Sequence, residues 1–141
     1  MIRAEISAPI VVGADMVVVR VQDMVGRGPY RPGFSHRWAD PLHEMRNPSF
    51  MVEFPFVEQM LQRRPPAESA YGCAFRTLEQ ARKWFSEDER SKLAGLGYRL
   101  VAMKVDDILD ESERQLVFWR RLPLRKNVHP LAAWEARELC I

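Results

Sequence analysis

Three arginines and a tyrosine, gathered on one strand end and one glycine-rich loop, are the residues of this chain best suited to bind an anion. Arg20 lies near the end of a β-branched run, and the loop G-R-G-P-Y-R-P-G, over Gly26–Gly33, follows it. This loop carries Arg27, Tyr30 and Arg31. The planar fork of a guanidinium donates two parallel hydrogen bonds to a phosphate or carboxylate, and backbone N–H groups beside glycine add to such a site. The loop therefore either binds an anion or is a surface loop whose arginines pair with acids.

Arg20 is the one charged residue in the run Met16–Val21, M-V-V-V-R-V. A charge inside a buried strand needs a partner or a ligand, because an unpaired buried charge is costly. Either an acid such as Asp23 pairs with Arg20, or the guanidinium binds a ligand. The nearby loop matches neither the Walker phosphate loop, which needs G-K-[ST], nor a G-x-G-x-x-G motif at a strand-to-helix turn.

Histidines and acids follow the loop, but their spacing does not predict a metal site. His43 and Glu44 would need a second histidine three positions later to complete the zinc motif H-E-x-x-H, and Asn47 stands there. We therefore expect no metal. The role of His43 stays open, and His36 is either a structural or exposed loop residue or an acid–base group.

Four strands are expected to form the sheet that positions these residues, over 16–22, 72–75, 98–105 and 115–120. Two capping boxes, Thr77–Gln80 and Ser86–Glu89, predict a pair of short helices after the second strand. The aromatic stripe of these helices is expected to be core, and Gly95 or Gly97 should end the second helix.

Other elements are less regular in sequence. Asp40 before Pro41 has the form of a helix N-cap with proline at the first helical position, which predicts a short helix over 41–46. A second helix is expected over 57–63, and the acidic segment 106–113 is expected to hold one helical turn. A terminal helix should start at Pro130.

Length and composition favour one α+β domain over residues 1–141. The formal charge is +2 and the arginines are scattered, so nucleic acid is not the favoured partner, although RNA binding through the arginines stays as a third alternative. The spacing of Cys73 and Cys140 fits no zinc template. Neither a signal peptide nor a membrane-spanning run is recognised, so we expect a soluble, cytoplasmic protein without a membrane partner.

The order of elements resembles the split sheet of the ADP-ribosyltransferase fold: a strand with Arg20, a basic loop, an irregular and helical segment, a short strand into a helix, and two further strands. This resemblance implies a small mixed (split) β-sheet flanked by short helices, with NAD as the bound substrate. The chain also resembles short uncharacterised bacterial and phage proteins with the patterns V-x-R-V, G-x-G-P-Y-R and F-x-[ST]-L-E-Q-x-R-x-W-F, over residues 17–121.

The transferase resemblance assigns roles to individual residues. Binding of the diphosphate falls to Arg20, Arg27 and Arg31, stacking on nicotinamide to Tyr30 or Tyr71, and orientation of the ribose to Glu113 or Gln115. The sequence departs from the family where C-A-F-R-T, residues 73–77, replaces S-T-S. It departs again where Gln115 replaces the catalytic glutamate, because a glutamine offsets no developing positive charge. Either Glu113 supplies that charge, or the chain is a binding module.

Two classes of function are therefore open. The first is NAD-type nucleotide binding, with mono-ADP-ribosyl transfer as the chemistry. The second is a non-catalytic phage or bacterial interaction protein, such as an inhibitor of a host or defence protein. Arginine and tryptophan are typical anchors of protein interfaces, so its anchors would be the exposed arginines with Trp38, Trp119 and Trp134.

Overall fold

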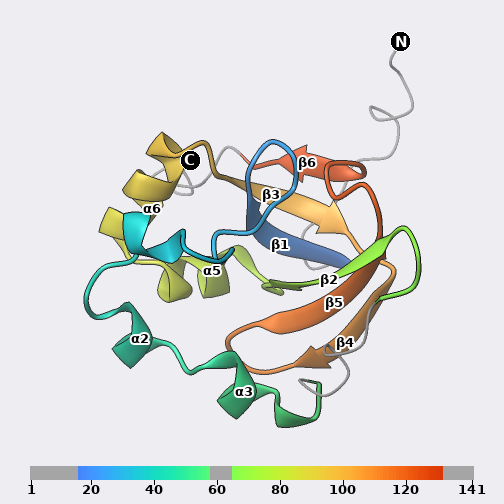
Figure 1. Cartoon of the computed structure of the whole chain (residues 1–141), viewed down its shortest axis with the longest axis horizontal. Helices are drawn as coiled ribbons and strands as arrows, with labels where there is room; N and C mark the ends of the chain where they lie inside the picture. Colours follow the sequence, from blue (N-terminus) through green and yellow to red (C-terminus); the bar gives the residue numbers. More distant parts are fainter. Residues whose placement is uncertain (1–15, 58–64, 132–141) are drawn as a thin grey trace.

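The structure, a computed structural model, describes residues 16–57 and 65–131, and in this part of the chain strands form two small sheets (Figure 1). One sheet has the order β1-β3-β6 and the other the order β2-β5-β4. The strands are β1 (Val17–Gln22), β2 (Ser69–Ala74), β3 (Arg99–Lys104), β4 (Asp107–Glu111), β5 (Leu116–Arg121) and β6 (Val128–Pro130). The helices are η1 (Ser35–Arg37), α2 (His43–Arg46), α3 (Phe50–Glu53), α5 (Leu78–Trp84) and α6 (Glu87–Gly95).

The α+β class is confirmed, but the sheets are not the mixed sheet that was expected. Every strand pairing in the described residues is antiparallel. The two sheets meet at an isolated bridge between Val19 and Phe75, whose backbone N–O distances are both 2.7 Å. This geometry does not confirm a relation to the ADP-ribosyltransferase fold.

Strand β1 is buried on both faces, although it lies at the edge of its sheet. Val19 and Val21 pack into a core with α5 and α6, whereas Val18 packs into the core between the two sheets. Successive side chains of a strand point to opposite faces, so Arg20 shares the face of Val18. Its guanidinium carbon lies 5.2 Å from the centre of the Phe118 ring. The charge of Arg20 is thus held between the sheets.

Both predicted capping boxes are confirmed. The Thr77 hydroxyl accepts from the Gln80 backbone N–H at 3.2 Å, and the Gln80 side chain accepts from the Thr77 N–H at 3.1 Å. Ser86 and Glu89 exchange the corresponding bonds at the start of α6. After α6 the chain turns at Gly97, whose φ of 90° lies in the left-handed region that favours glycine. Both helices pack in one core with Phe34 and Trp38 of the segment after β1.

Two strands stand where helical structure was expected. Strand β4 occupies the segment predicted to hold a helical turn, because Ile108 packs into the core between the sheets and Leu109 packs toward α3. Consecutive apolar residues buried on opposite faces are a strand pattern. Strand β6 pairs with β3 at the predicted start of the terminal helix. The rest of that predicted helix, residues 132–141, lies outside the described residues.

Of the helices predicted between β1 and β2, the one over 41–46 begins two residues later than expected. Asp40 is not the N-cap of α2; its carboxylate instead accepts from the Leu42 backbone N–H at 2.9 Å, and the helix begins at His43. Ser49 caps α3, which Figure 1 shows beside β5 and β4. Residues 55–57 are also helical, while most of the helix predicted over 57–63 lies outside the described residues. Over 16–57 and 65–131, no helix is both long and apolar enough to cross a membrane.

Candidate functional site

Two adjoining pockets lie where the loop after β1 meets β2 and α5. Four residues line both of them: Tyr30, Cys73, Trp84 and Gln115. The arginine pocket, of about 370 Å³, is also lined by Arg20, Arg27, Gly28, Arg31 and Gly72. The histidine pocket, of about 690 Å³, is also lined by His43, Glu44, Asn47 and Phe50. One continuous region thus has a cationic part and a part with an aromatic and an imidazole wall.

Most of the site residues predicted from the sequence meet at the arginine pocket. Those that line it are Arg20, Arg27, Tyr30, Arg31 and Gln115. Tyr71 and Glu113 line neither of the two pockets. Tyr71 is half-buried on β2, opposite Trp119 of β5. Glu113 is exposed in the turn before β5, where its backbone carbonyl accepts from the Gln80 side chain at 2.8 Å.

Arg20 is buried and bonded to neutral oxygens. Its Nε donates to the Gln22 side chain at 2.9 Å, and its two terminal nitrogens donate to the carbonyls of Cys73 and Gly26 at 2.9 and 3.2 Å. Burial lowers the pKa of Arg20 to about 10, so the group stays charged at neutral pH. Asp23, the expected partner, instead pairs with Arg27 at 2.7 Å. Within the described residues no carboxylate forms an ion pair with Arg20.

Gly72 leaves the space that Arg20 occupies. A Cβ at this position would lie 2.6 Å from Phe118 Cζ and 2.8 Å from Arg20 Nη1, both closer than real Cβ contacts. Phe118 stands opposite Gly72 in the β2–β5 ladder, and three hydrogen bonds hold the Arg20 guanidinium in place, so both groups resist displacement. A glycine is therefore required for the guanidinium to reach the arginine pocket.

The two loop arginines, Arg27 and Arg31, differ in the partners that their guanidinium groups have. The Arg27 side chain is 56% exposed and forms an ion pair with Asp23. The Arg31 guanidinium stacks on Phe34, with its carbon 4.1 Å from the ring centre. Its Nε is shielded from solvent and has no hydrogen-bond partner within the described part of the chain. A buried N–H without a partner is rare in native structures, and here it is consistent with a ligand position.

A chain of hydrogen bonds crosses the junction of the two pockets. The Trp84 indole N–H donates to the Tyr30 oxygen at 2.7 Å, and this oxygen lies 2.5 Å from His43 Nε2. His43 Nδ1 lies 2.8 Å from a carboxylate oxygen of Glu89. Burial raises the pKa of the Tyr30 hydroxyl above its usual value, so this phenol is neutral near pH 7.

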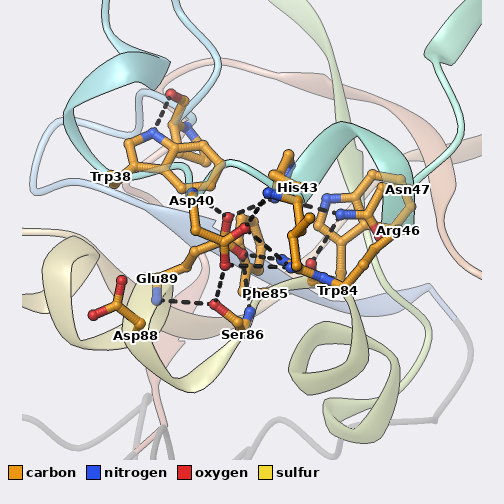
Figure 2. Close-up of polar contacts among 12 residues, drawn as sticks. Trp38, Asp40, His43, Arg46, Asn47, Trp84, Phe85, Ser86, Asp88 and Glu89 are labelled. Atoms are coloured by element: carbon orange, nitrogen blue, oxygen red, sulfur yellow. Dashed lines mark hydrogen bonds and ion pairs between the residues drawn. The ribbon is translucent and has the colours of Figure 1, made fainter.

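Glu89 is the last member of this chain of hydrogen bonds, and it holds His43 in position (Figure 2). Its side chain is fully buried. One oxygen accepts from Arg46 at 2.7 Å and from the Ser86 N–H at 2.9 Å, and the other accepts from the Asp40 N–H at 2.9 Å as well as facing His43. Figure 2 shows these donors converging on the carboxylate from α2, the segment before it and the start of α6. The negative charge of Glu89 is therefore compensated within the protein.

The carboxylate beside Gln115 is Glu53, which no sequence pattern singles out. The Gln115 amide donates to Glu53 Oε1 at 2.7 Å, and the Ser112 hydroxyl donates to Oε2 at 2.5 Å. These pairings join α3 to the turn before β5 across 62 and 59 positions. Such long-range contacts leave no spacing signal in one sequence.

Other wall residues were predicted only as core or loop. Trp84 belongs to the predicted aromatic stripe and is buried, and it also lines both pockets. His43 is buried, whereas His36 is exposed. Cys73 faces both pockets, and burial raises the pKa of its thiol to about 11. The described residues contain no cluster of three or more histidine, cysteine, aspartate or glutamate side chains that could hold a metal ion.

Of the three tryptophans named as anchors of an interaction protein, Trp38 is enclosed in the core. Trp38 is fully buried, and its indole N–H donates to the Pro29 carbonyl at 3.0 Å. That prediction is therefore wrong for Trp38, because aromatic packing around Tyr30 and Phe85 encloses it. Trp119 is half-buried and donates to Ser69, and Trp134 lies outside the described residues.

Comparison with known families places this chain among phage proteins. The family model described as "Bacteriophage T4 Y00F protein" matches residues 16–128, well over half of the chain. The chain belongs to this family, whose description names no activity. The match supports the resemblance to phage proteins seen over residues 17–121. No curated protein and no solved structure matches the chain, so the comparisons lend no support to a relation with ADP-ribosyltransferases.

Proposed function

We propose that this phage-family protein binds a nucleotide of the NAD type, with the diphosphate in the arginine pocket and an aromatic ring of the ligand in the histidine pocket. One observation carries the proposal. Arg20 is a buried cation without a carboxylate partner in the described residues, and it lines a pocket together with Arg27 and Arg31.

The electrostatics favour an anionic ligand. Arg20 keeps its charge in a buried setting and donates only to neutral oxygens. A phosphate oxygen placed against it would form a charge-assisted hydrogen bond, which is worth more than a bond between neutral groups. Arg31 adds a second cation whose Nε has no partner in the described part.

The adjoining pocket suits the rest of a nucleotide. Its volume of about 690 Å³ is in the usual range of small-molecule sites. Trp84 and Phe50 offer ring surfaces, and Asn47, Glu44 and His43 offer polar groups. Tyr30 stands between this pocket and the arginines, where the ribose and phosphates of the ligand would lie.

Mono-ADP-ribosyl transfer is the chemical extension of this proposal. Gln115 lines both pockets, and its amide nitrogen is held by Glu53. The carbonyl oxygen of the same amide would then accept a hydrogen bond from a ribose hydroxyl. Glu113 lines neither pocket, so the negative charge that the transfer requires is assigned to Glu53, whose carboxylate lies 2.7 Å from the Gln115 amide.

Calorimetric titration with NAD and with ADP-ribose tests binding, using a matched pair of variants. Arg31 and Arg37 both stack on Phe34, at 4.1 and 5.5 Å, but only Arg31 lines the arginine pocket. Arg31→Gln should weaken binding about tenfold or more, which corresponds to about 1.4 kcal/mol or more. Arg37→Gln should bind as the wild type does. Absence of heat with both ligands would contradict the proposal.

Release of nicotinamide from NAD, followed by chromatography, tests the transfer. If the protein transfers ADP-ribose, the wild type should release nicotinamide from NAD, and Gln115→Ala should release it much more slowly. Binding without release would leave a nucleotide-binding protein that does not transfer ADP-ribose. This result would remove the chemistry and keep the binding.

A protein-binding role, the second function open from the sequence, has a separate supporting observation. Apolar side chains are exposed along the segment of α2 and α3: Leu42, Met45, Val52 and Phe56 are 56%, 81%, 75% and 86% exposed. A protein partner would contact these residues rather than Trp38. No feature of the described residues identifies such a partner, so this role becomes the preferred one only if neither nucleotide binds.

A further inference from the structure

The Tyr30 oxygen lies between a base and a hydrogen-bond donor. His43 Nε2 is 2.5 Å from it, and the Trp84 indole N–H donates to it at 2.7 Å. An indole nitrogen is only a donor, so the tyrosine oxygen accepts from Trp84. In the neutral imidazole, where Nε2 carries a lone pair, the Tyr30 O–H donates to His43 Nε2.

The carboxylate of Glu89 fixes the tautomer of His43. Nδ1 lies 2.8 Å from Glu89 Oε2, and an ionised carboxylate only accepts, so Nδ1 carries the hydrogen. The charged groups that surround the imidazole are Glu89 of α6, Arg46 of α2 and Asp40 of the preceding segment, and all three are joined in one network. The order hydroxyl, imidazole, carboxylate is that of an activated nucleophile.

We propose that Tyr30, His43 and Glu89 form a relay that makes the Tyr30 oxygen a nucleophile toward a phosphorus atom of a bound nucleotide diphosphate. The inference rests on the proposed function, because the arginine pocket that Tyr30 lines is where the diphosphate is placed. Glu89 is a positioning residue in this relay, since it acts through His43.

The step is a nucleotidyl transfer to tyrosine. The Tyr30 oxygen forms a bond to phosphorus, and the bond from phosphorus to the bridging oxygen of the diphosphate breaks. The bridging oxygen leaves with the electron pair as part of a phosphate monoester. The phenol proton passes to His43 Nε2, and the resulting imidazolium faces Glu89. With NAD, attack at the adenosine phosphate leaves an adenylyl group on Tyr30 and releases nicotinamide mononucleotide.

The environment of Tyr30 explains why a base in contact is needed. Burial raises the pKa of the phenol, so almost no phenolate is present near pH 7. A nucleophile that is weak at its own pKa is activated by a neighbouring general base that takes the proton as the new bond forms. The side chain is still 49% exposed, so a ligand in either pocket can reach it.

Phenylmethanesulfonyl fluoride tests the relay without a nucleotide. The tyrosine oxygen displaces fluoride from sulfur, and peptide mass spectrometry reports the rate at each tyrosine. In the wild type, Tyr30 should be labelled at least about tenfold faster than Tyr71, which is half-buried and has no histidine among its described contacts. His43→Gln should lower the Tyr30 rate about tenfold or more and leave Tyr71 unchanged.

The pH profile separates the relay from a structural role. In the wild type, labelling of Tyr30 should already be fast well below the pH at which a phenol ionises, because His43 takes the proton as the new bond forms. In His43→Gln it should keep rising until the phenol itself ionises. Equal labelling of Tyr30 and Tyr71 in the wild type overturns the relay, and so does an unchanged Tyr30 rate in a folded His43→Gln variant.

Incubation with NAD then tests the substrate class. An adenylyl adduct mapped to Tyr30, absent in Tyr30→Phe, is the expected result. Fast sulfonylation without any adduct, in a protein shown by calorimetry to bind NAD, overturns the nucleotidyl step. Fast sulfonylation in a protein that does not bind NAD instead locates the failure in the proposed function.

Discussion

Arg20 and Glu89 are two buried charges that the protein treats in opposite ways. Glu89 is fully buried, and its carboxylate faces the side chains of Arg46 and His43 as well as two backbone N–H groups. Arg20 is 7% exposed, and within residues 16–57 and 65–131 its guanidinium donates only to neutral oxygens. The charge of Glu89 is thus compensated inside the fold by contacts that link α2 to α6.

The difference indicates which of the two regions is available to a ligand. A buried anion that already accepts four contacts has little capacity left for a fifth. A buried cation bonded to neutral groups still carries a field that an incoming anion can satisfy. The Glu89 network therefore holds His43 in position inside the fold, and the arginine pocket is the binding site that we propose.

Removing Glu89 should have the largest effect. Glu89→Ala leaves Arg46 and His43 facing an empty site, and loss of one partner of a buried charge pair costs about 3 to 5 kcal/mol of unfolding free energy. Urea unfolding followed by circular dichroism measures this. Glu87→Ala, on the exposed side of the same helix turn, should change stability by less than about 0.5 kcal/mol. Similar losses in the two variants would contradict the description of Glu89.

Removing Arg20 should cost less stability than removing Glu89. Arg20→Met abolishes three hydrogen bonds to neutral acceptors but leaves no charge unpaired, so we expect a loss of about 1 to 3 kcal/mol in the same urea experiment. The variant should also lose measurable binding of ADP-ribose. A stability loss equal to that of Glu89→Ala would show that the Arg20 charge is compensated within the protein, against our account.

Filling the space at Gly72 should disturb the arginine pocket through packing. The added methyl of Gly72→Ala meets Phe118 and Arg20 at less than 3 Å, and overpacking of this kind costs about 1 to 3 kcal/mol. Gly95→Ala is the matched control, because nothing lies within 4 Å of its added Cβ. At this helix end the control should be neutral or slightly stabilising, by up to about 1 kcal/mol. If thermal melts show Gly72→Ala to be more stable than Gly95→Ala, the tight packing described around Gly72 is contradicted.

Acid should weaken the Glu89 side of the molecule through Asp40. Burial opposes ionisation of Asp40, but hydrogen bonds from Arg46 and Ser86 outweigh it and hold the pKa below the usual 3.8. Because the folded-state pKa is the lower one, this stabilisation is complete above pH 3.8 and is lost as the pH falls through the folded-state value. The urea midpoint of the wild type should therefore fall more between about pH 6 and about pH 3 than that of Asp40→Asn. An equal fall in both proteins would exclude this source of acid sensitivity.

The smallest effect is expected at Cys73, on the wall that both pockets share. Its thiol has a pKa raised to about 11 by burial, so it should react with iodoacetamide at neutral pH about tenfold or more slowly than a free cysteine. The measurement uses a Cys140→Ser background, and ADP-ribose should slow the reaction further. A thiol that reacts as fast as free cysteine would mean that the pocket wall is open to solvent.

Local chemistry in the sequence predicted a large part of the fold. The capping boxes at Thr77 and Ser86 and the strand around Arg20 could be read directly, because each depends on residues a few positions apart. Strand β4 could not, since its acidic residues conceal the pair Ile108 and Leu109, which are partly buried on opposite faces.

The sequence predicted the cationic residues of the candidate site and Gln115, but not the long-range contacts that hold them. Arg27, Tyr30 and Arg31 share Gly26–Gly33 and were selected together. Glu89 was identified as a capping residue, but its contact with His43 joins residues far apart in the chain and leaves no periodic signal. Glu53 beside Gln115 is invisible for the same reason.

One NMR titration tests most directly the central claim that the arginine pocket binds a nucleotide anion. Titration of ADP-ribose into ¹⁵N-labelled protein reports on the indole N–H of Trp84, which lines both pockets, and on that of Trp119, which donates to Ser69 and lines neither. The account predicts that the Trp84 signal and the backbone signals of Gly28 and Arg31 shift and saturate together, while the Trp119 signal stays in place. Saturating ADP-ribose that moves none of these three signals would contradict it.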